Sequence, residues 1–478
     1  MNQPTSRDDS TSAVADRPNV VIFVADDLGY GDMSCMGAPD VRTPHLDSIA
    51  ESGVRFTSWY SNSPVCSPSR ASLMTGRYPG NAGIRSILLG YRMTPGLTPD
   101  VPTLATALKA EGYRTELIGK WHLGLAEESR PGVHGFDKTF GCLAGNCDYY
   151  SHIHYAPNNR HATIRGKHYV GTPLHDLWEN NEEIYRDGEY MTEIIRERAV
   201  KAVRGYAEQQ DPFLLYVPFT APHFPMHAPQ KYKDRFAHLP WEKMIMAAMI
   251  SAMDDAVGDV LNELETQGLR ENTIVFFMSD NGPSREIRNW LDGTQETYHG
   301  GSSGTLKGHK FSLFEGGVRV PAVMSWPRVI PSGQVIDEPL AAMDIFPTVL
   351  SAVGGEVTKY ELDGMDILDT LRIGAASPHE YLFWEQNNQT AVRHGSWKLV
   401  INGQLEEGLQ AADEIFLSNL EDDMSEHVNL ADRYPVVVEH LRGAAESWRE
   451  GIEARWKDEW LPRIPDHEAY FFPMDAAK

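Results

Sequence analysis

Short apolar runs alternate along this chain with longer segments in which apolar residues recur at helical spacing. The apolar runs predict four strands, at residues 20–25, 115–118, 213–217 and 273–278. The helical spacing predicts four helices, at residues 46–52, 101–111, 192–207 and 244–266. Because nearly every position in the first and last strands is apolar, both faces of those strands are expected to be covered. The alternation indicates an α/β domain with a large, mostly parallel β-sheet between helices.

The pattern changes after about Gly364. Strands are predicted at 391–401 and 413–419, and a closing helix is predicted at 435–452. These elements indicate a second, smaller α+β subdomain. The chain is therefore expected to divide into a frayed tail at 1–18, a main domain at 19–365 and a C-terminal subdomain at 366–478.

The segment 456–474 near the end of the chain is dense in Trp, Pro, Tyr and Phe. Such a segment is too aromatic to be solvated. We expect it to pack on its own chain or on a neighbouring subunit, and the second case would make the protein a homo-oligomer.

The charge and composition of the chain exclude several classes of protein. The 478 residues include 43 basic and 67 acidic side chains, a formal net charge of −24. Phosphate contacts need a basic face, so this acidity argues against nucleic-acid binding. No apolar span approaches the roughly 20 residues of a transmembrane helix, the first nineteen residues do not resemble a signal peptide, and four cysteines are too few for a disulfide framework. We expect a cytoplasmic protein with no membrane partner.

Acidic and amide residues follow two of the predicted strands. Asp26 and Asp27 come directly after the first, and Asp280 and Asn281 come after the last. Ligands of open α/β sheets gather beyond the carboxyl ends of strands. Three carboxylates and an amide oxygen form an all-oxygen set that suits Ca²⁺ or Mg²⁺ better than Zn²⁺. The alternative is that each pair caps a helix or begins a turn.

The segment 66–77 reads CSPSRASLMTGR. It resembles the signature of the type I, formylglycine-dependent sulfatases, C-x-P-x-R followed by x4-T-G-R, with every fixed position filled. The alternative is a buried cysteine before a helix N-terminus, where Pro68 and Ser69 are good starters. The resemblance implies a large mixed sheet between helices, as in the alkaline phosphatase-like superfamily, with a small antiparallel C-terminal sheet. It also implies an enzyme that hydrolyses sulfate esters.

In that family an installing enzyme, which would be a partner of the nascent chain, oxidises the signature cysteine to formylglycine (3-oxoalanine). The aldehyde hydrates to a geminal diol. A sulfate ester of serine would be a stable dead end, whereas the second hydroxyl of the diol can lose its proton and expel sulfate. The resemblance therefore implies that Cys66 is modified in the mature enzyme.

Three further segments fit the same family. The GKWHLG segment at 119–124 is similar to the one that supplies an active-site lysine and histidine, here Lys120 and His122. The APHFP segment at 221–225 matches the family's later histidine with His223. The loop at 306–321 resembles the one that carries the last active-site lysine, and counting back from its Glu-Gly-Gly selects Lys310 over Lys307.

The resemblance implies one divalent ion, usually calcium although magnesium also fits. Its implied ligands are Asp26, Asp27, Asp280, Asn281 and the diol of modified Cys66. The ion would lower the pKa of the attacking hydroxyl and neutralise charge on the transferring group. Together with three active-site cations it would make the pocket locally cationic, so the global acidity does not forbid a sulfate ester.

The family also implies roles for the remaining site residues. Arg70 would orient the diol, and Lys120 and Lys310 would bind sulfate oxygens. His122 would take the second diol proton. His223, alone or together with Lys310, would stabilise or protonate the leaving oxygen.

An irregular segment at 142–176 is the candidate for recognising the rest of the substrate. It carries Asp148, Tyr149 and His152, and His227 is a further candidate beyond it. Aromatic platforms with polar edges suit an aryl group or a sugar, and the segment also resembles loops of sulfatases that act on sulfated N-acetylhexosamines. The alternative is an ordinary surface loop.

Two rival functions stay open at this point. The first is a phosphodiesterase or phosphonate monoester hydrolase of the same superfamily, some of which also use formylglycine. The second is a catalytically silent protein that binds sulfated glycans. A silent relative would be expected to lack Cys66, Lys120 or Lys310, and all three are present.

Overall fold

The computed structural model describes residues 17–156, 172–285, 300–406 and 409–464. Among these residues the main domain is built on a mixed ten-stranded sheet with the order β13-β2-β12-β11-β1-β10-β4-β5-β8-β9. At its centre β1 (Asn19–Ala25) pairs in parallel with β10 (Phe213–Pro218) and with β11 (Thr273–Ser279). Beyond β10 lies β4 (Arg114–Ile118), also parallel. All four predicted strands are therefore neighbours in one sheet.

Shorter strands complete the sheet and form two small ribbons. The added sheet strands are β2 (Val54–Phe56), β5 (Lys138–Gly141), β8 (Trp178–Glu179), β9 (Glu182–Glu183), β12 (Ala322–Ser325) and β13 (Gln334–Ile336). The ribbons are β3 (Trp59–Tyr60) with β14 (Leu340–Ala341), and β6 (Ile153–Ala156) with β7 (Thr172–His175). Because β12 runs antiparallel to β11 and β2, the sheet is mixed, as the family resemblance implied.

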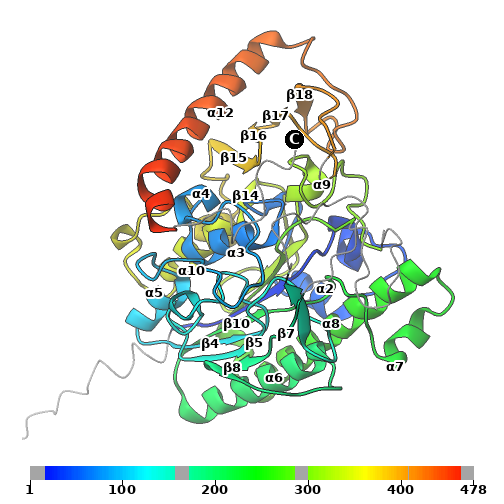
Figure 1. Ribbon diagram of the computed structural model, residues 1–478, viewed down its shortest axis with the longest axis vertical. Helices are drawn as coiled ribbons and strands as arrows, with labels where there is room; N and C mark the ends of the chain where they lie inside the picture. Colours follow the sequence, from blue (N-terminus) through cyan, green and yellow to red (C-terminus); the bar gives the residue numbers. More distant parts are fainter. Residues whose placement is uncertain (1–16, 157–171, 286–299, 407–408, 465–478) are drawn as a thin grey trace, which may run out of the picture.

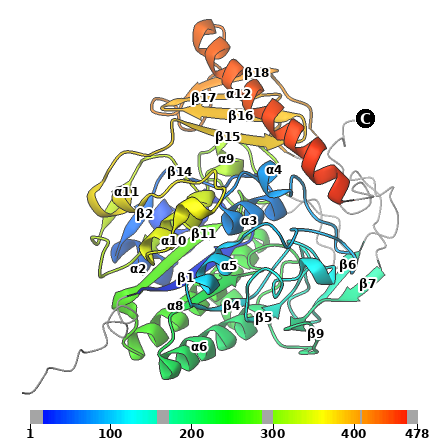
Figure 2. The ribbon, with the colours of Figure 1, turned by 90° about the vertical axis from the view of Figure 1, so that its left-hand side faces the viewer.

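Helices cover both faces of the large sheet (Figure 2). Alternate residues of β1 point to opposite faces, so Val20, Ile22 and Val24 lie in one hydrophobic core while Val21 and Phe23 lie in another. The first core includes residues of α3 (Cys66–Thr75), α5 (Leu104–Ala110), α10 (Ile345–Ala352) and α11 (Leu368–Ile373). The second includes residues of α2 (Pro44–Glu51), α6 (Met191–Gln209) and α8 (Trp241–Thr266). The remaining short helices are α4 (Pro79–Ala82), α7 (Gln230–Lys233) and α9 (Glu315–Val318).

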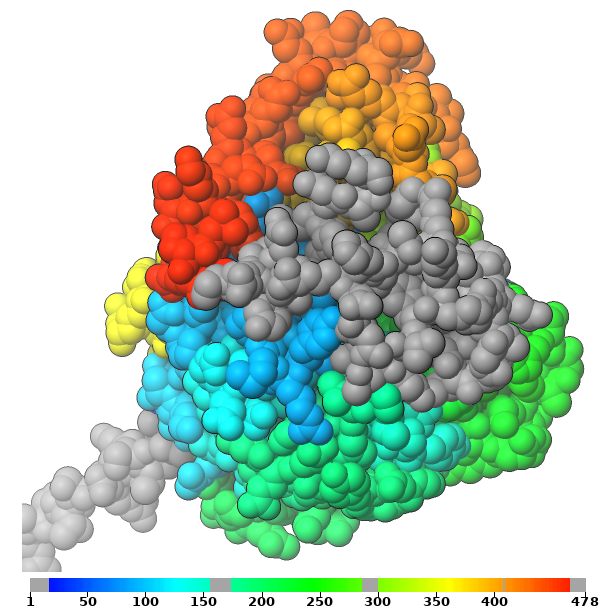
Figure 3. All heavy atoms as spheres, in the orientation of Figure 1, coloured from blue at the N-terminus to red at the C-terminus, as the bar shows by residue number. Residues whose placement is uncertain are grey.

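A four-stranded antiparallel sheet forms the C-terminal part of the fold (Figure 1). The residues of this part gather at the top of the molecule in the space-filling view (Figure 3). Its strands are β15 (Tyr381–Gln386), β16 (Gln389–His394), β17 (Trp397–Ile401) and β18 (Ile415–Asn419). The long helix α12 (Pro435–Arg455) lies across it. The prediction of a single strand at 391–401 is wrong: Gly395, with a φ of +58°, turns the chain between two strands. The division at residue 365 stays a prediction.

Buried ion pairs join the small sheet to the main domain. The Lys398 ammonium on β17 is fully buried, 2.7 Å from Glu315 Oε1 on α9 and 3.5 Å from Glu426 Oε1. Arg85 of the main domain donates to Glu385 Oε1 on β15 over 2.9 Å. The contact between the small sheet and the main domain therefore includes buried, desolvated ion pairs.

The aromatic C-terminal segment packs on its own chain as far as the structure describes it. Trp456 and Trp460 are 4% and 1% exposed and belong to the core that contains α3 and α10. The part of the predicted aromatic tail after residue 464 lies outside the described residues, and association of subunits through it stays a prediction. No described helix combines the length and hydropathy needed to cross a membrane.

Candidate active site

The acidic residues predicted at two strand ends meet at one edge of the sheet. Ala25 of β1 lies in register with Ser279 of β11, so the residues that follow both strands emerge side by side. The Asp27 backbone amide donates to Asp280 Oδ1 over 3.1 Å, and Asn281 Nδ2 donates to Asp27 Oδ1 over 2.6 Å. These side chains, and that of Asp26, are at most 2% exposed.

Three buried cations surround these carboxylates. Arg70 Nε donates to Asp280 Oδ2 over 2.9 Å, and Lys120 Nζ donates to Asp26 Oδ2 over 2.6 Å. Lys310 Nζ donates to Asp27 Oδ2 over 2.9 Å. The three positive charges balance the three aspartates, which allows the cluster to be buried.

The pKa values of two aspartates diverge in this cluster. Burial raises the pKa of Asp280 above its usual range, and the Arg70 charge only partly opposes it. Burial acts in the same direction on Asp27, but Lys310 and His223 outweigh it and hold the pKa of Asp27 below its usual range. Asp27 is therefore an ionised ligand candidate even in mild acid.

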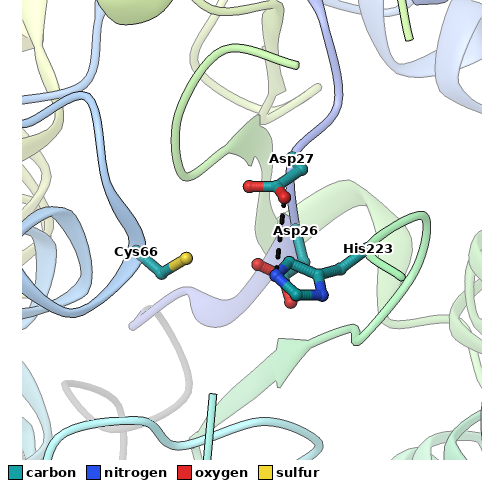
Figure 4. A group of neighbouring side chains, drawn as sticks. All are labelled: Asp26, Asp27, Cys66 and His223. Atoms are coloured by element: carbon teal, nitrogen blue, oxygen red, sulfur yellow. Dashed lines mark ion pairs between the residues drawn. The ribbon is translucent and has the colours of Figure 1, made fainter. Parts of the chain in front are cut away.

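Cys66 begins α3 and faces the acidic cluster (Figure 4). Ligand atoms of Asp26, Asp27, Cys66 and His223 all lie within 4.8 Å of one another. Burial raises the pKa of the Cys66 thiol to about 12, despite the opposing charges of Lys120 and Lys310. An unmodified Cys66 would therefore stay a protonated thiol at neutral pH, which is a poor nucleophile.

The donor set fits a hard divalent cation. Asp26 Oδ1 and Asn281 Oδ1 are buried and have no hydrogen-bond partner among the described residues. Asp26 Oδ1 lies 3.4 Å from an Arg70 guanidinium nitrogen, a charge contact too long for a good hydrogen bond. Buried polar atoms rarely stay without a hydrogen bond, so these two oxygens indicate a ligand between the strand ends. Carboxylate and amide oxygens match the preference of Ca²⁺ and Mg²⁺.

His223 lies between an acid and a cation. Its Nε2 is 3.5 Å from Asp27 Oδ2 and 3.3 Å from Lys310 Nζ. Its Nδ1 is 2.7 Å from the Phe224 carbonyl oxygen, so the hydrogen bond assigns the proton to Nδ1 and leaves Nε2 able to accept or carry a proton.

His122 is fully buried and neutral. Its Nε2 lies 3.1 Å from the Leu88 carbonyl oxygen, while Nδ1 has no hydrogen-bond partner among the described residues. Burial, with the positive charges of Lys120 and Arg70, lowers the pKa of His122 well below its ordinary value. Donation from Nε2 leaves the Nδ1 lone pair free, which is the state of a general base.

The choice between two lysines of the loop at 306–321 is resolved by their surroundings. Lys310 is 4% exposed and bonded to Asp27, as described above. Lys307 Nζ lies instead over the ring of Phe416, 3.6 Å from its centroid. The structure thus brings Lys310 into the cluster and places Lys307 against aromatic rings.

The four residues proposed to contact substrate have different environments. His227 is part-exposed, and its Nδ1 lies 3.1 Å from Asp148 Oδ2. Tyr149 is fully buried, and its hydroxyl lies 2.7 Å from Thr220 O and 2.9 Å from His223 O. Its placement gives no support to a substrate contact and indicates that it holds the His223 loop. His152 is also fully buried and belongs to a separate cluster described below.

A cavity of about 310 Å³ opens beside His227. It is lined by Tyr150, Met226, His227, Ala228, Gln230, Lys233, Trp241 and Ile245. The centroid of the His227 ring lies 6.5 Å from that of the Tyr149 ring. Tyr149 therefore lies beside both the cavity wall at His227 and the His223 loop that its hydroxyl contacts. Aromatic, amide and ammonium groups around one cavity suit a polar ring compound.

Sequence reasoning missed the backbone that orients the site. The Leu88 carbonyl oxygen, which fixes the His122 ring, carries no side-chain signal. Ser67 Oγ accepts from the Leu88 amide over 3.1 Å and so ties this loop to α3. Ser67 occupies a variable position of the cysteine signature. Its place directly after Cys66 is the only sequence signal that pointed to a role in orienting the site.

Comparison with known proteins places these residues in a family context. The family model described as Sulfatase matches residues 18–355. Human steryl-sulfatase is 31% identical over 462 residues, covering 82% of this chain and 77% of that protein. Mouse N-acetylgalactosamine-6-sulfatase is 32% identical over 402 residues, covering 80% and 71%.

Solved structures of similar fold include one with a saccharide bound. The crystal structure of Ps i-CgsB in complex with k-i-k-neocarrahexaose matches with a TM-score of 0.78 and 29% identity, covering 94% of this chain and 98% of that one. The PsFucS1 sulfatase from Pseudoalteromonas sp. matches with a TM-score of 0.74 and 25% identity, covering 96% and 93%. The phosphonate monoester hydrolase of Agrobacterium radiobacter, at 20% identity and a TM-score of 0.61, shares the fold.

Proposed function

Because the chain belongs to the sulfatase family and hydrolyses sulfate esters, we propose that its substrate is a sulfated saccharide, that Cys66 is its nucleophile after conversion to formylglycine, and that its metal is calcium. The observation that carries this proposal is the position of Cys66. Its side chain lies within 4.8 Å of ligand atoms from Asp26, Asp27 and His223, at the edge of the sheet where the two acidic strand ends meet.

Calcium is favoured by the chemistry of the donor set. Three carboxylates and the Asn281 amide oxygen are hard ligands, and flexible oxygen cages of this kind accommodate Ca²⁺ more readily than the strictly octahedral Mg²⁺. When bound, the ion and the formylglycine would supply a deprotonated hydroxyl nucleophile and neutralise charge on the sulfuryl group.

The buried cations would bind and orient the sulfate. Lys120 and Lys310 each contact a different member of the aspartate pair, 2.6 Å from Asp26 Oδ2 and 2.9 Å from Asp27 Oδ2. Both can turn part of their hydrogen-bonding capacity towards sulfate oxygens, because an ammonium has three donors. Arg70, held by Asp280 and by the Lys120 carbonyl oxygen over 3.2 Å, would fix the side chain at position 66. Fixed donors aimed at developing negative charge are the main source of rate enhancement in such sites.

Two histidines would divide the proton transfers. His122 is held neutral by burial and by neighbouring cations, so it can accept the proton that leaves position 66 when sulfate is expelled. His223, with Nε2 beside the Lys310 ammonium, can deliver a proton to the leaving alcohol oxygen. The water-poor setting strengthens each of these interactions.

The lining of the cavity beside His227 supports a saccharide as the substrate. It offers the aromatic rings of Tyr150 and Trp241 together with the polar ends of Gln230 and Lys233. Sugar rings stack on aromatic faces and exchange hydrogen bonds at their edges, and an ammonium can meet a further anionic group of a sulfated chain. The saccharide-bound neighbour of 29% identity supports the same class of ligand.

The test compares kcat/KM across four ester classes. The protein is co-expressed with a formylglycine-installing enzyme, and release of inorganic sulfate or phosphate is measured. The substrates are sulfated galactose oligosaccharides, an aryl sulfate, a steroid sulfate and an aryl phosphate diester. A kcat/KM at least about tenfold higher for a sulfated saccharide supports the proposal, since this ratio is about 1.4 kcal/mol of transition-state discrimination.

The other outcomes overturn parts of the proposal. A preference for aryl or steroid sulfate would remove the saccharide assignment but leave the sulfatase. A preference for the phosphate diester would contradict the sulfate specificity. No turnover with position 66 fully converted would favour a silent binding protein.

A further inference from the structure

A second group of potential metal ligands lies outside the sulfatase site. His152 follows the Asp148 loop, His175 ends β7, and Asp187 lies in the turn before α6. One ligand atom from each lies within 4.8 Å of the others. The rings of His152 and His175 are 6.4 Å apart and nearly perpendicular, at 84°. Two imidazoles and a carboxylate therefore converge apart from the residues assigned to the first metal, the sulfate and the proton transfers, and His152, predicted from the sequence to contact substrate, belongs to this group.

His175 is oriented as a metal ligand would be. Its Nδ1 lies 3.1 Å from Glu183 Oε1, and Glu183 is itself held by Arg92 through a contact of 2.8 Å. Donation from Nδ1 to the carboxylate leaves the lone pair on Nε2. That Nε2 is buried and has no hydrogen-bond partner among the described residues. A carboxylate behind an imidazole is the usual support of a metal-bound histidine.

His152 provides an independent observation. Its side chain is fully buried, and neither ring nitrogen meets a hydrogen-bond partner among the described residues. The Glu189 backbone lies near the ring without meeting ordinary hydrogen-bond geometry. His152 also has a φ of +53°, a conformation that costs energy for a residue with a side chain. A strained and unpaired buried imidazole needs a compensating partner.

We propose that His152, His175 and Asp187 form a binding site for Zn²⁺, with water in the remaining position. Two imidazole nitrogens and one carboxylate oxygen are a set that zinc accepts, in a four-coordinate arrangement. Calcium is disfavoured here because it takes six to eight oxygen ligands. The site therefore differs in ligand chemistry from the all-oxygen cluster at the strand ends.

The zinc would brace the loop that supports the sulfatase site. The His152 backbone amide donates to Asp148 O over 3.1 Å, and the His152 carbonyl accepts from the Asp176 amide over 2.8 Å. Asp148 in turn pairs with His227, and the adjacent Tyr149 holds the His223 loop. Fixing His152 to β7 and to the turn at Asp187 would restrict the whole segment 148–152.

A second histidine and acid grouping offers a matched control. His45, Asp254 and Asp255 also bring ligand atoms within 4.8 Å of one another. There, however, the Asp254 carboxylate already accepts the backbone amides of His45 and Leu46 at the start of α2. Its oxygens are used in capping the helix, so this grouping is expected to bind no zinc tightly.

The experiment titrates Zn²⁺ alone into the full chain after chelator treatment and restoration of calcium. Wild-type protein is expected to bind about one zinc per chain, detected by elemental mass spectrometry after gel filtration and by calorimetry. His175→Gln should abolish this binding. Asp187→Asn, at an exposed position, should weaken it about tenfold or more while keeping the fold. His45→Gln should bind zinc as wild type does.

A second readout locates the ion. Zinc should slow amide hydrogen exchange of segment 148–152 in wild type and in His45→Gln, but not in Asp187→Asn. The proposal is overturned if folded wild type binds no zinc, if Asp187→Asn and wild type bind it equally, or if exchange in this segment does not respond. Because none of these readouts requires turnover, the result is independent of the proposed saccharide substrate.

Discussion

Replacing Tyr149 by Phe removes one hydroxyl group from beneath the His223 loop and leaves the ring in place. In the structure this hydroxyl is 2.7 Å from Thr220 O and 2.9 Å from His223 O. The Thr220 carbonyl oxygen keeps a second donor, the His223 amide at 3.1 Å. The variant therefore mainly removes the hydrogen bond to the His223 carbonyl oxygen. Leaving a buried acceptor without its donor costs about 1–3 kcal/mol.

The larger effect of Tyr149→Phe is expected on catalysis. His223 Nε2 must stay beside the Lys310 ammonium, 3.3 Å away, to protonate the leaving oxygen as proposed. A misplacement of about 1 Å in a reacting group can cost roughly a hundredfold in rate. We expect kcat to fall about 10- to 100-fold, with a much smaller change in KM.

The assay is steady-state sulfate release, with chemical denaturation measured in parallel. Tyr190→Phe is the matched control, because Tyr190 packs on Tyr149 with ring centroids 5.3 Å apart and its hydroxyl donates to His227 O over 2.8 Å. The control should lose comparable stability but keep kcat within a few-fold. Equal loss of kcat in both variants, or wild-type kcat in Tyr149→Phe, would refute the positioning role.

Three further predictions concern the metal and the buried charges. Asp280→Asn should weaken calcium affinity about tenfold or more in calorimetry, because a charged oxygen ligand becomes neutral, and unchanged affinity would remove this residue from the site. Lys398→Met should destabilise the fold by about 3 kcal/mol in urea unfolding, because Glu315 then keeps only Arg319 as a charged partner and Glu426 loses its nearest ammonium, and a loss below about 1 kcal/mol would show that these ion pairs contribute little. Burial raises the pKa of Glu426 above its ordinary 4.5, so the folded state holds this proton more tightly than the unfolded state and stability falls as pH rises from about 4.5 through the raised pKa. Glu426→Gln should remove that fall, and an unchanged slope of stability against pH over this range would show that Glu426 does not cause it.

The central elements of the fold could be predicted because their residues obey simple periodicities. Strands 20–25 and 273–278 are continuous apolar runs, and they occur as β1 and β11 at the middle of the sheet. Short strands such as β2 and β13, of three residues each, carry too few positions for a period to be recognised. The hairpin at Gly395 was missed because the apolar residues on its two sides read as one run.

The site was predictable to the extent that its chemistry lies in short motifs. Asp26 with Asp27, and Asp280 with Asn281, could be brought together because parallel strands end at one edge of a sheet. The supporting role of Tyr149 could not be read from the sequence, since its partners are backbone carbonyls of residues about seventy positions later. The His152 cluster depends on a turn and a hairpin whose register no local pattern specifies.

The most direct test of the formylglycine mechanism is the mass of the peptide that contains residue 66, measured in protein with known sulfatase activity. We expect that this residue has lost one sulfur and two hydrogens and gained one oxygen, and that kcat per chain rises in proportion to the converted fraction. Full steady-state activity in protein whose residue 66 is entirely free thiol would contradict it.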